Sequence, residues 1–286
     1  MSPNRQKNRG YWSVSMGDCR QGGFVGSRAP EPSARILMAR QKKAKIFLRR
    51  GSFASRSVWW WFKRAFLLLF GLFFLYQLTI ATQVVWFRWF DPQSTAFIDA
   101  ERRRLATLDP PQQINQRWVN YQDISVNAKR AVISAEDTGF VDHAGIEWEA
   151  IERAMLANAE SGSIRFGGST ITMQLAKNLF LSSDRSYVRK AQEIAIALLI
   201  DVVMDKPRIL ELYLNVAEWG AGVFGIEAAA QHYFGRSASR LTARQAAWLA
   251  AILPSPKRYD LNRQSRWVDR RTGIIMRRMP QVAVPE

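Results

Sequence analysis

The sequence predicts a mainly α-helical domain that is preceded by a single transmembrane helix. An uncharged apolar run of 21 residues extends from Ala65 to Val85. From about Ile124 onward, apolar residues recur at helical rather than alternating spacing. Hydrophobic residues make up 48% of the 286 positions, which is enough for a sizeable core.

The basic charge is concentrated in the N-terminal quarter of the chain. The net charge is +17, and residues 1–64 hold 15 Lys and Arg against 2 Asp and Glu. Residues 1–56 show no sustained period, so we predict a basic, disordered tail. Met38 is a hypothetical alternative start, which an intact mass beginning at Met1 would refute. The single Cys19 cannot form an internal disulfide, and two histidines exclude a multi-His metal site.

The apolar run has the features of an uncleaved membrane anchor. As a helix it would span about 31 Å, enough for the hydrocarbon core of a bilayer. Trp59–Trp61 precede it and Trp86 and Trp89 follow it, as aromatic belts do at membrane interfaces. A cleaved signal peptide is the alternative, but the run is long and no small-residue cleavage site follows it.

The basic flank predicts the orientation of this anchor. Lys63 and Arg64 lie at its N-terminal edge, so residues 1–56 are expected in the cytoplasm. Residues 57–90 then form the anchor, and residues 91–286 form the domain on the other side. Residues 86–125 contain Asp-Pro turns and are interpreted as a connecting segment. Helices are predicted at 148–160, 170–181, 187–204, 207–214, 226–234, 243–253 and 265–279.

A dense group of polar residues follows the apolar run that ends at Ile133. Glu136, Asp137, Phe140, His143 and Gly145 occur within ten positions. A carboxylate next to a buried segment is costly unless it is met by partners, and burial raises its pKa toward values that suit a general acid or base. A turn with a solvated acidic pair is the alternative interpretation.

A second group lies at the start of a predicted helix, where Gly167 and Gly168 precede Ser169 as a candidate N-cap. Glycines before a helix let backbone N–H groups approach an anion. Lys177 is placed to share a helix face with Thr170 and Gln174. A flexible loop at 161–168 with an ordinary cap explains the pattern equally well.

Three further stretches complete the pattern. Glu193 has Arg189 and Lys190 at i−4 and i−3, the spacing of a surface salt bridge, but it begins an apolar segment and is expected to be partly buried. Residues 206–220 supply core positions such as Ile209, Leu210 and Tyr213. Residues 244–254 are small and apolar, which indicates close helix packing.

Together these five stretches resemble, in order and spacing, the five motifs of the family 51 glycosyltransferases, the peptidoglycan glycosyltransferases. The resemblance covers about residues 120–260, and Met173 stands where the family often has a second Gln. The sequence ends about thirty residues after Pro256, and no Ser-x-x-Lys with Lys-Thr-Gly is present. We therefore expect the monofunctional, membrane-anchored form of the family.

The resemblance implies a lysozyme-like α-helical domain that polymerises lipid II into β-1,4-linked glycan strands and releases undecaprenyl diphosphate. It makes Glu136 the catalytic base and Glu193 the second catalytic carboxylate, as a cation organiser or a metal ligand. Residues implied in substrate binding are Ser169, Thr170, Gln174, Lys177, Asn178, Arg185, Arg189 and Lys190. Residues implied in support of the site are Asp137, Phe140, His143 and Asn215.

The resemblance also implies the cofactors, the partners and the location. The family often uses a divalent cation such as Mg²⁺. The expected partners are lipid II, the growing glycan chain, the inner membrane and other cell wall synthesis or division proteins, and no nucleic acid. The domain is expected in the periplasm. The alternatives are a membrane-anchored lytic glycosidase of lysozyme-like fold and a tethered nucleic-acid- or lipid-binding protein that uses the basic tail.

Overall fold

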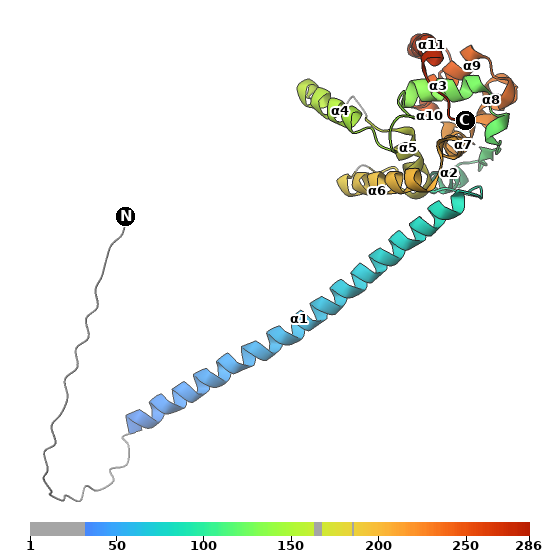
Figure 1. The fold of residues 1–286 in the computed structure, drawn as a ribbon. Coiled ribbons are helices and arrows are strands. Elements are labelled where there is room, and N and C mark those ends of the chain that lie inside the picture. The colour runs from blue at the N-terminus through green and yellow to red at the C-terminus, as the bar shows by residue number, and fades with distance from the viewer. Residues whose placement is uncertain (1–31, 163–167, 185) are drawn as a thin grey trace, which may run out of the picture. The chain divides into compact units, whose positions relative to one another are not determined.

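The computed structural model describes residues 32–162, 168–184 and 186–286, with side chains from Val58 onward. The chain divides into two compact units, Met1–Leu69 and Phe70–Glu286. The mainly α prediction is confirmed (Figure 1). The helices of the second unit after the anchor are α2 (Ala96–Ala106), α3 (Val126–Glu136), α4 (Trp148–Ser161), α5 (Ile171–Phe180), α6 (Tyr187–Val203), α7 (Lys206–Val216), α8 (Ile226–Phe234), α9 (Ala243–Ile252), α10 (Pro256–Leu261) and α11 (Arg266–Arg278).

The first helix, α1 (Pro32–Phe87), is longer than the predicted anchor. Its segment Val58–Phe87 is long and apolar enough to cross a membrane, with a mean hydropathy of 2.0. The prediction of disorder is wrong for residues 32–56, which are helical. This stretch lacks Gly and Pro between 33 and 50 and is rich in Ala, Arg, Lys and Leu, which favour helix, and it continues a helix already formed. Residues 1–31 lie outside the described part of the chain.

The interpretation of residues 86–125 as only a connecting segment is also wrong, because α2 lies within it. Thr95 caps α2, since its side-chain oxygen accepts a hydrogen bond from the backbone N–H of Ile98 at 3.2 Å. Ile98 and Leu105 are fully buried, so this helix is held by two core side chains on one face. A short η1 turn (Tyr121–Asp123) follows before α3 begins.

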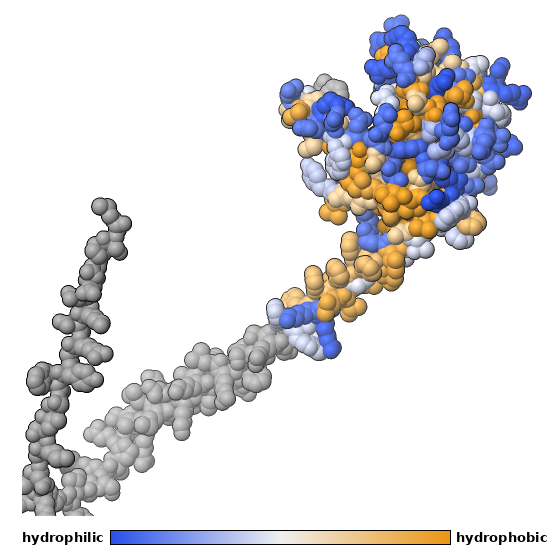
Figure 2. Space-filling view, in the orientation of Figure 1, coloured by the Kyte–Doolittle hydropathy of each residue, from blue (hydrophilic) through white to orange (hydrophobic). Residues whose placement is uncertain are grey.

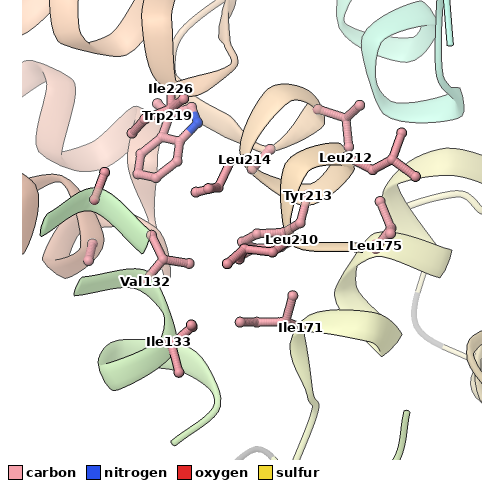
Figure 3. Close-up of a cluster of buried hydrophobic side chains, with 14 of the residues drawn as sticks. Val132, Ile133, Ile171, Leu175, Leu210, Leu212, Tyr213, Leu214, Trp219 and Ile226 are labelled. Carbon is pink, nitrogen blue, oxygen red and sulfur yellow. The ribbon is translucent and has the colours of Figure 1, made fainter. Parts of the chain in front are cut away.

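The core is built around α7, whose residues from Ile209 to Val216 are almost all buried. Figure 3 shows Leu210, Tyr213 and Leu214 of α7 between Val132 of α3 and Ile171 of α5. The small residues of α9 pack closely against α3 and α11, as the sequence predicts. The core positions predicted in 206–220 and 244–254 are thus confirmed.

A small three-stranded sheet lies beside α7, in the order β1 (Asn115–Gln116), β3 (Val223–Phe224), β2 (Glu218–Gly220). Asn215 fastens the chain near β1, because its side chain accepts a hydrogen bond from Val119 N and donates one to Val119 O, both at 2.9 Å. Gly225 has a φ of 83°, and a Cβ there would lie 2.9 Å from the Asn215 carbonyl oxygen. Asn215 therefore supports the fold around α7.

Candidate active site

Glu136 is the last residue of α3, and its carboxylate is largely enclosed. Gln174 Nε2 of α5 donates to Glu136 Oε2 at 2.9 Å, and an Arg271 guanidinium nitrogen of α11 lies 3.3 Å from Oε1. The Glu136 side chain is 12% exposed. Burial raises the pKa of Glu136, and the contacts with Gln174 and Arg271 oppose that shift without cancelling it. The carboxyl is therefore poised to accept a proton.

A hydrogen-bonded chain orients this carboxylate from the core. The Tyr213 hydroxyl donates to Gln174 Oε1 at 3.0 Å, which leaves the Gln174 amide nitrogen to donate to Glu136. Tyr213 is 1% exposed. Because the tyrosine fixes which end of the Gln174 amide faces it, the amide nitrogen is the atom that faces the carboxylate. The sequence identified Tyr213 only as a core residue.

The carboxylate of Asp137 makes different contacts from that of Glu136. Its Oδ2 accepts from the backbone N–H of Ile171, the first residue of α5, at 2.9 Å. Its Oδ1 lies 2.8 Å from Nε2 of His143. A carboxylate at a helix N-terminus is favoured by the helix dipole. Asp137 therefore links the end of α3 to the start of α5 and so fixes the relative position of Glu136 and Gln174.

The side chain of Lys206 holds the loop that follows Glu136. The Lys206 ammonium donates to the His143 carbonyl oxygen and to Asp201, each at 2.7 Å, and lies 4.9 Å from the Phe140 ring centroid. Gly145 is packed so closely that a Cβ would lie 2.9 Å from Asp201 Cβ. Lys206 thus holds the loop that carries Phe140 and His143, whose supporting role at the site stays a prediction.

The start of α5 differs by one residue from the prediction. Thr170 is the N-cap, since its hydroxyl accepts from Met173 N at 3.2 Å and donates to the Gly145 carbonyl at 2.6 Å. Ser169 instead accepts a hydrogen bond from Lys190 Nζ at 2.8 Å. Thr170 is the cap because its hydroxyl satisfies two buried backbone groups at once. The predicted loop 161–168 lies mostly outside the described residues.

The second carboxylate, Glu193, is only 2% exposed and is held by two cations. Arg189 donates to its Oε2 at 2.5 Å, and Lys190 donates to its Oε1 at 2.6 Å. The predicted burial of Glu193 is therefore confirmed. Since Lys190 also reaches Ser169, this cluster ties α6 to the start of α5.

Lys177 stands between the two carboxylates. Burial lowers the pKa of its ammonium, and the charges of Glu193 and Glu136 both act on it in the opposite direction. Among the described residues Lys177 has no salt-bridge partner, and its Nζ lies 5.5 Å from the Phe97 ring centroid. Asn178 is buried beside it on α5. Arg185, predicted to bind substrate, lies outside the described residues.

The residues present do not fit a metal ion held by the protein. Both oxygens of Glu193 already accept from Arg189 and Lys190. Within the described ranges, no three His, Cys, Asp or Glu side chains gather as a metal-binding group. Mg²⁺ prefers an octahedral set of oxygen ligands. The Mg²⁺ requirement remains a prediction.

Sequence reasoning missed Arg271, which contacts Glu136 from 135 residues away. Its nitrogen also donates to the Ala135 carbonyl oxygen at 3.2 Å. Helix α11 carries several other arginines, so no local pattern distinguishes this one. Only the packing of α11 against α3 and α9 brings it to the carboxylate.

The fold and the site define a class of protein: a helical domain that follows a helix long and apolar enough to cross a membrane, with an enclosed carboxyl at Glu136 and two cations paired with Glu193. Comparison with known proteins gives the family. Residues 101–280 match the Transglycosylase family model. A biosynthetic peptidoglycan transglycosylase of Laribacter hongkongensis is 50% identical over 225 residues, which cover 79% of this chain and 99% of that protein. One of Bordetella avium is 51% identical over 221 residues, 76% of this chain and 92% of that protein. The chain belongs to the transglycosylase family.

Proposed function

We propose that this chain is a peptidoglycan glycosyltransferase that polymerises lipid II into β-1,4-linked glycan strands, with Glu136 as general base. The observation that carries the proposal is the environment of Glu136. Its carboxyl is enclosed at the end of α3, has a raised pKa, and has the unpaired ammonium of Lys177 nearby among the described residues. A transfer with a hydroxyl nucleophile and an anionic leaving group requires these two features side by side.

The chemistry assigned to Glu136 is proton removal. The 4-hydroxyl of the acceptor sugar attacks the anomeric carbon of the donor, and Glu136 takes the hydroxyl proton as the new C–O bond forms. The bond from the anomeric carbon to the diphosphate oxygen breaks, and the electron pair leaves with the diphosphate. Gln174 holds the carboxylate oxygen in place during this step.

The leaving diphosphate is assigned to the cations of α5 and α6. Lys177 is the described cation without a carboxylate partner, so its charge is available to an incoming anion. Arg189 presents a guanidinium, whose planar fork suits phosphate oxygens, but it is shared with Glu193. Glu193 therefore serves as the fixed anion that holds Arg189 and Lys190 in position. Ser169 and Thr170 border the same space at the start of α5.

The predicted membrane span supports the proposal that the substrate is linked to a lipid. Val58–Phe87 is continuous with the domain that carries the site, so the site stays near the surface where a lipid carrier ends. The basic flank favours an N-terminus in the cytoplasm and a domain in the periplasm at the inner membrane. A cysteine placed at exposed Leu261 should react with an impermeant reagent only from the periplasmic side.

The test is incubation of the purified full chain with lipid II and, separately, with intact sacculi. Polymer formation from lipid II supports the proposal, whereas release of soluble muropeptides from sacculi would assign a lytic glycosidase instead. Glu136→Gln is expected to lower polymerisation by about 10²–10⁴-fold, the usual contribution of a general base. Glu149→Gln, whose side chain is 86% exposed, is the matched control. The same polymerisation reaction with a chelator added tests whether the diphosphate substrate must carry a bound divalent cation.

A further inference from the structure

Helix α11 carries a stripe of arginines on its outer side. Arg266, Arg270 and Arg277 are all exposed, and at 100° per residue they fall within an arc of about 40°. The buried residues Val268 and Ile275 face the opposite way, toward the core. The stripe is about 16 Å long, because its first and last members are three turns apart. Figure 2 shows mainly hydrophilic surface where Figure 1 labels α11.

These three arginines have no acidic partner among the described residues. By contrast, Arg263, just before the helix, is paired with Asp260. Arg271, on the same helix, is paired with Glu136. The helix contains a single acidic residue, Asp269, which does not pair with the stripe in the described part of the chain. Like charges one turn apart on a helix repel each other, so the stripe is open to a ligand that carries several negative charges.

The part of the domain around the stripe is strongly basic. Residues 236–278 hold 11 Lys and Arg against 2 Asp and Glu, whereas residues 91–235 hold 14 against 19. The potential of such a charge cluster attracts a polyanion and is screened over about 8 Å at physiological ionic strength. The stripe therefore suits an anionic partner that lies directly on the helix.

A continuous surface leads from Glu136 to this stripe. Arg271 of α11 contacts Glu136. Trp267 and Ile274, 39% and 41% exposed, follow around the helix between Arg271 and the stripe. The Trp267 ring is held in place, because it stacks on Tyr259 with centroids 5.2 Å apart and lies 5.5 Å from the Arg271 guanidinium. Exposed Trp beside Arg is typical of binding surfaces, so a polymer leaving Glu136 along α11 would meet an aromatic ring and then the arginines.

The helices that carry the stripe differ from those that hold the end of α1. Arg208 of α7 donates to the Phe87 carbonyl oxygen at 2.9 Å, and Arg88 donates to the Val203 carbonyl oxygen of α6 at 2.8 Å. Helix α11 instead packs on α3 and α9. This separation favours a partner outside the membrane over lipid headgroups. Peptidoglycan is such a partner, because its strands carry peptides with free carboxylates at regular intervals, and guanidinium forks pair well with carboxylates.

The arginine face consists of exposed residues on the outer side of α11: Arg266, Trp267, Arg270 and Arg277. We propose that the arginine face binds the newly made glycan strand through the carboxylates of its peptide stems. The identity of this ligand rests on the proposed function. A strand held here after one addition stays at high effective concentration near the site for the next. Arg270 has no described contact with Glu136, so its loss weakens strand binding without moving the pH dependence of the rate.

Binding is tested with soluble peptidoglycan strands and the purified full chain, without lipid II. Arg270→Gln combined with Arg277→Gln should weaken binding about fivefold, because each exposed ion pair contributes modestly. Arg103→Gln combined with Arg117→Gln removes the same charge from exposed positions on α2 and after β1, and should bind like the parent chain. Arg270→Lys combined with Arg277→Lys keeps the charge and should restore most of the binding. Equal melting temperatures of these variants exclude a loss of fold.

Strands whose peptides have been removed by an amidase separate the stems from the sugars. The parent chain should bind these stripped strands about fivefold more weakly than intact strands, and its affinity for intact strands should fall as salt rises. Equal affinity of the parent chain for stripped and intact strands would overturn the proposal. Binding of a polyglutamate peptide without binding of intact strands would also overturn it, and would assign the arginine face to an acidic protein segment.

Polymerisation of lipid II separates this inference from the proposed function. The chain with Arg270→Gln and Arg277→Gln should release strands about twofold shorter than the chain with Arg103→Gln and Arg117→Gln, because weaker binding mostly reflects faster dissociation. Product lengths are compared by gel electrophoresis. Strands of equal length would overturn a role of the arginine face during synthesis. If the parent chain does not polymerise lipid II, the proposed function fails, whereas the strand-binding result stands by itself.

Discussion

Two buried carboxylates, Glu136 and Glu193, lie in opposite surroundings. Glu136 meets an amide at 2.9 Å and one guanidinium at 3.3 Å. Glu193 meets two cations at 2.5 and 2.6 Å. Both carboxylates are buried, but only Glu193 has a close positive charge at each of its oxygens. Burial alone therefore does not make a carboxylate a candidate general base, because its close partners also matter.

This contrast divides the site into two functions. A carboxyl that burial holds at a raised pKa can accept a proton during the reaction. The carboxylate of Glu193 accepts hydrogen bonds from Arg189 and Lys190 and keeps those cations in place. The charges of both carboxylates act on the ammonium of Lys177 and oppose the lowering of its pKa by burial.

The largest expected difference is between the two Glu→Gln variants in stability. Glu193→Gln removes the anion from Arg189 and Lys190, which should cost about 3 kcal/mol, the low end for a buried pair, because the Lys190 side chain is 37% exposed. Glu136→Gln replaces a carboxyl whose charged form is already disfavoured, so it should not destabilise the fold. Apparent melting temperatures of the full chain in one detergent give the comparison.

The pH dependence of folding stability gives a second test of this prediction. Because the folded-state pKa of Glu136 is raised, its contribution to stability falls as pH rises from the unfolded pKa of about 4.3 through the folded value. The stability of Glu136→Gln relative to the parent chain should therefore increase with pH over that window. A lower melting temperature for Glu136→Gln than for Glu193→Gln at neutral pH would contradict the division of roles.

Arg271→Ala should give the next largest effect, on activity. Arg271 lowers the pKa of Glu136 against the larger effect of burial, so its removal raises that pKa further. The base then needs a higher pH to be ionised, and the acid limb of the pH–rate profile moves to higher pH. A partly exposed pair contributes about 1 kcal/mol, about fivefold in rate on the acid side. Arg270→Ala, exposed and adjacent, is the control; an unshifted profile for Arg271→Ala would count against the contact.

The smallest effect is expected from Tyr213→Phe, which leaves the Gln174 carbonyl oxygen without its donor. Loss of one such hydrogen bond should cost about 1 kcal/mol of stability and a few-fold in polymerisation, because Gln174 is no longer held toward Glu136. Tyr233→Phe removes a comparable hydrogen bond to the Trp219 carbonyl at 2.8 Å, away from the site. Equal rate losses in both variants would show that Tyr213 acts only through the fold.

Much of the fold could be predicted because helix periodicity and caps are local. The bounds of α4, α6, α8 and α9 agree with the predictions to within one residue. Each error in the predicted helices has an identifiable cause. The α2 sequence was obscured by flanking Asp-Pro turns, and the cap of α5 moved from Ser169 to Thr170 because a distant carbonyl, that of Gly145, was available to its hydroxyl. Residues 32–56 are helical because they extend the span.

The sequence by itself determined the helical class, and it predicted a membrane anchor and, through its resemblance to a family, the residues of the site. Only the tertiary structure decided how those residues divide the chemistry. Asp137 was expected beside Glu136 as a supporting carboxylate, and it turns instead to α5 and His143. Arg271 and Tyr213 reach the site from helices that are distant in sequence. The physical reason is that local periodicity fixes which face of a helix is apolar, whereas burial and partners depend on how distant helices pack.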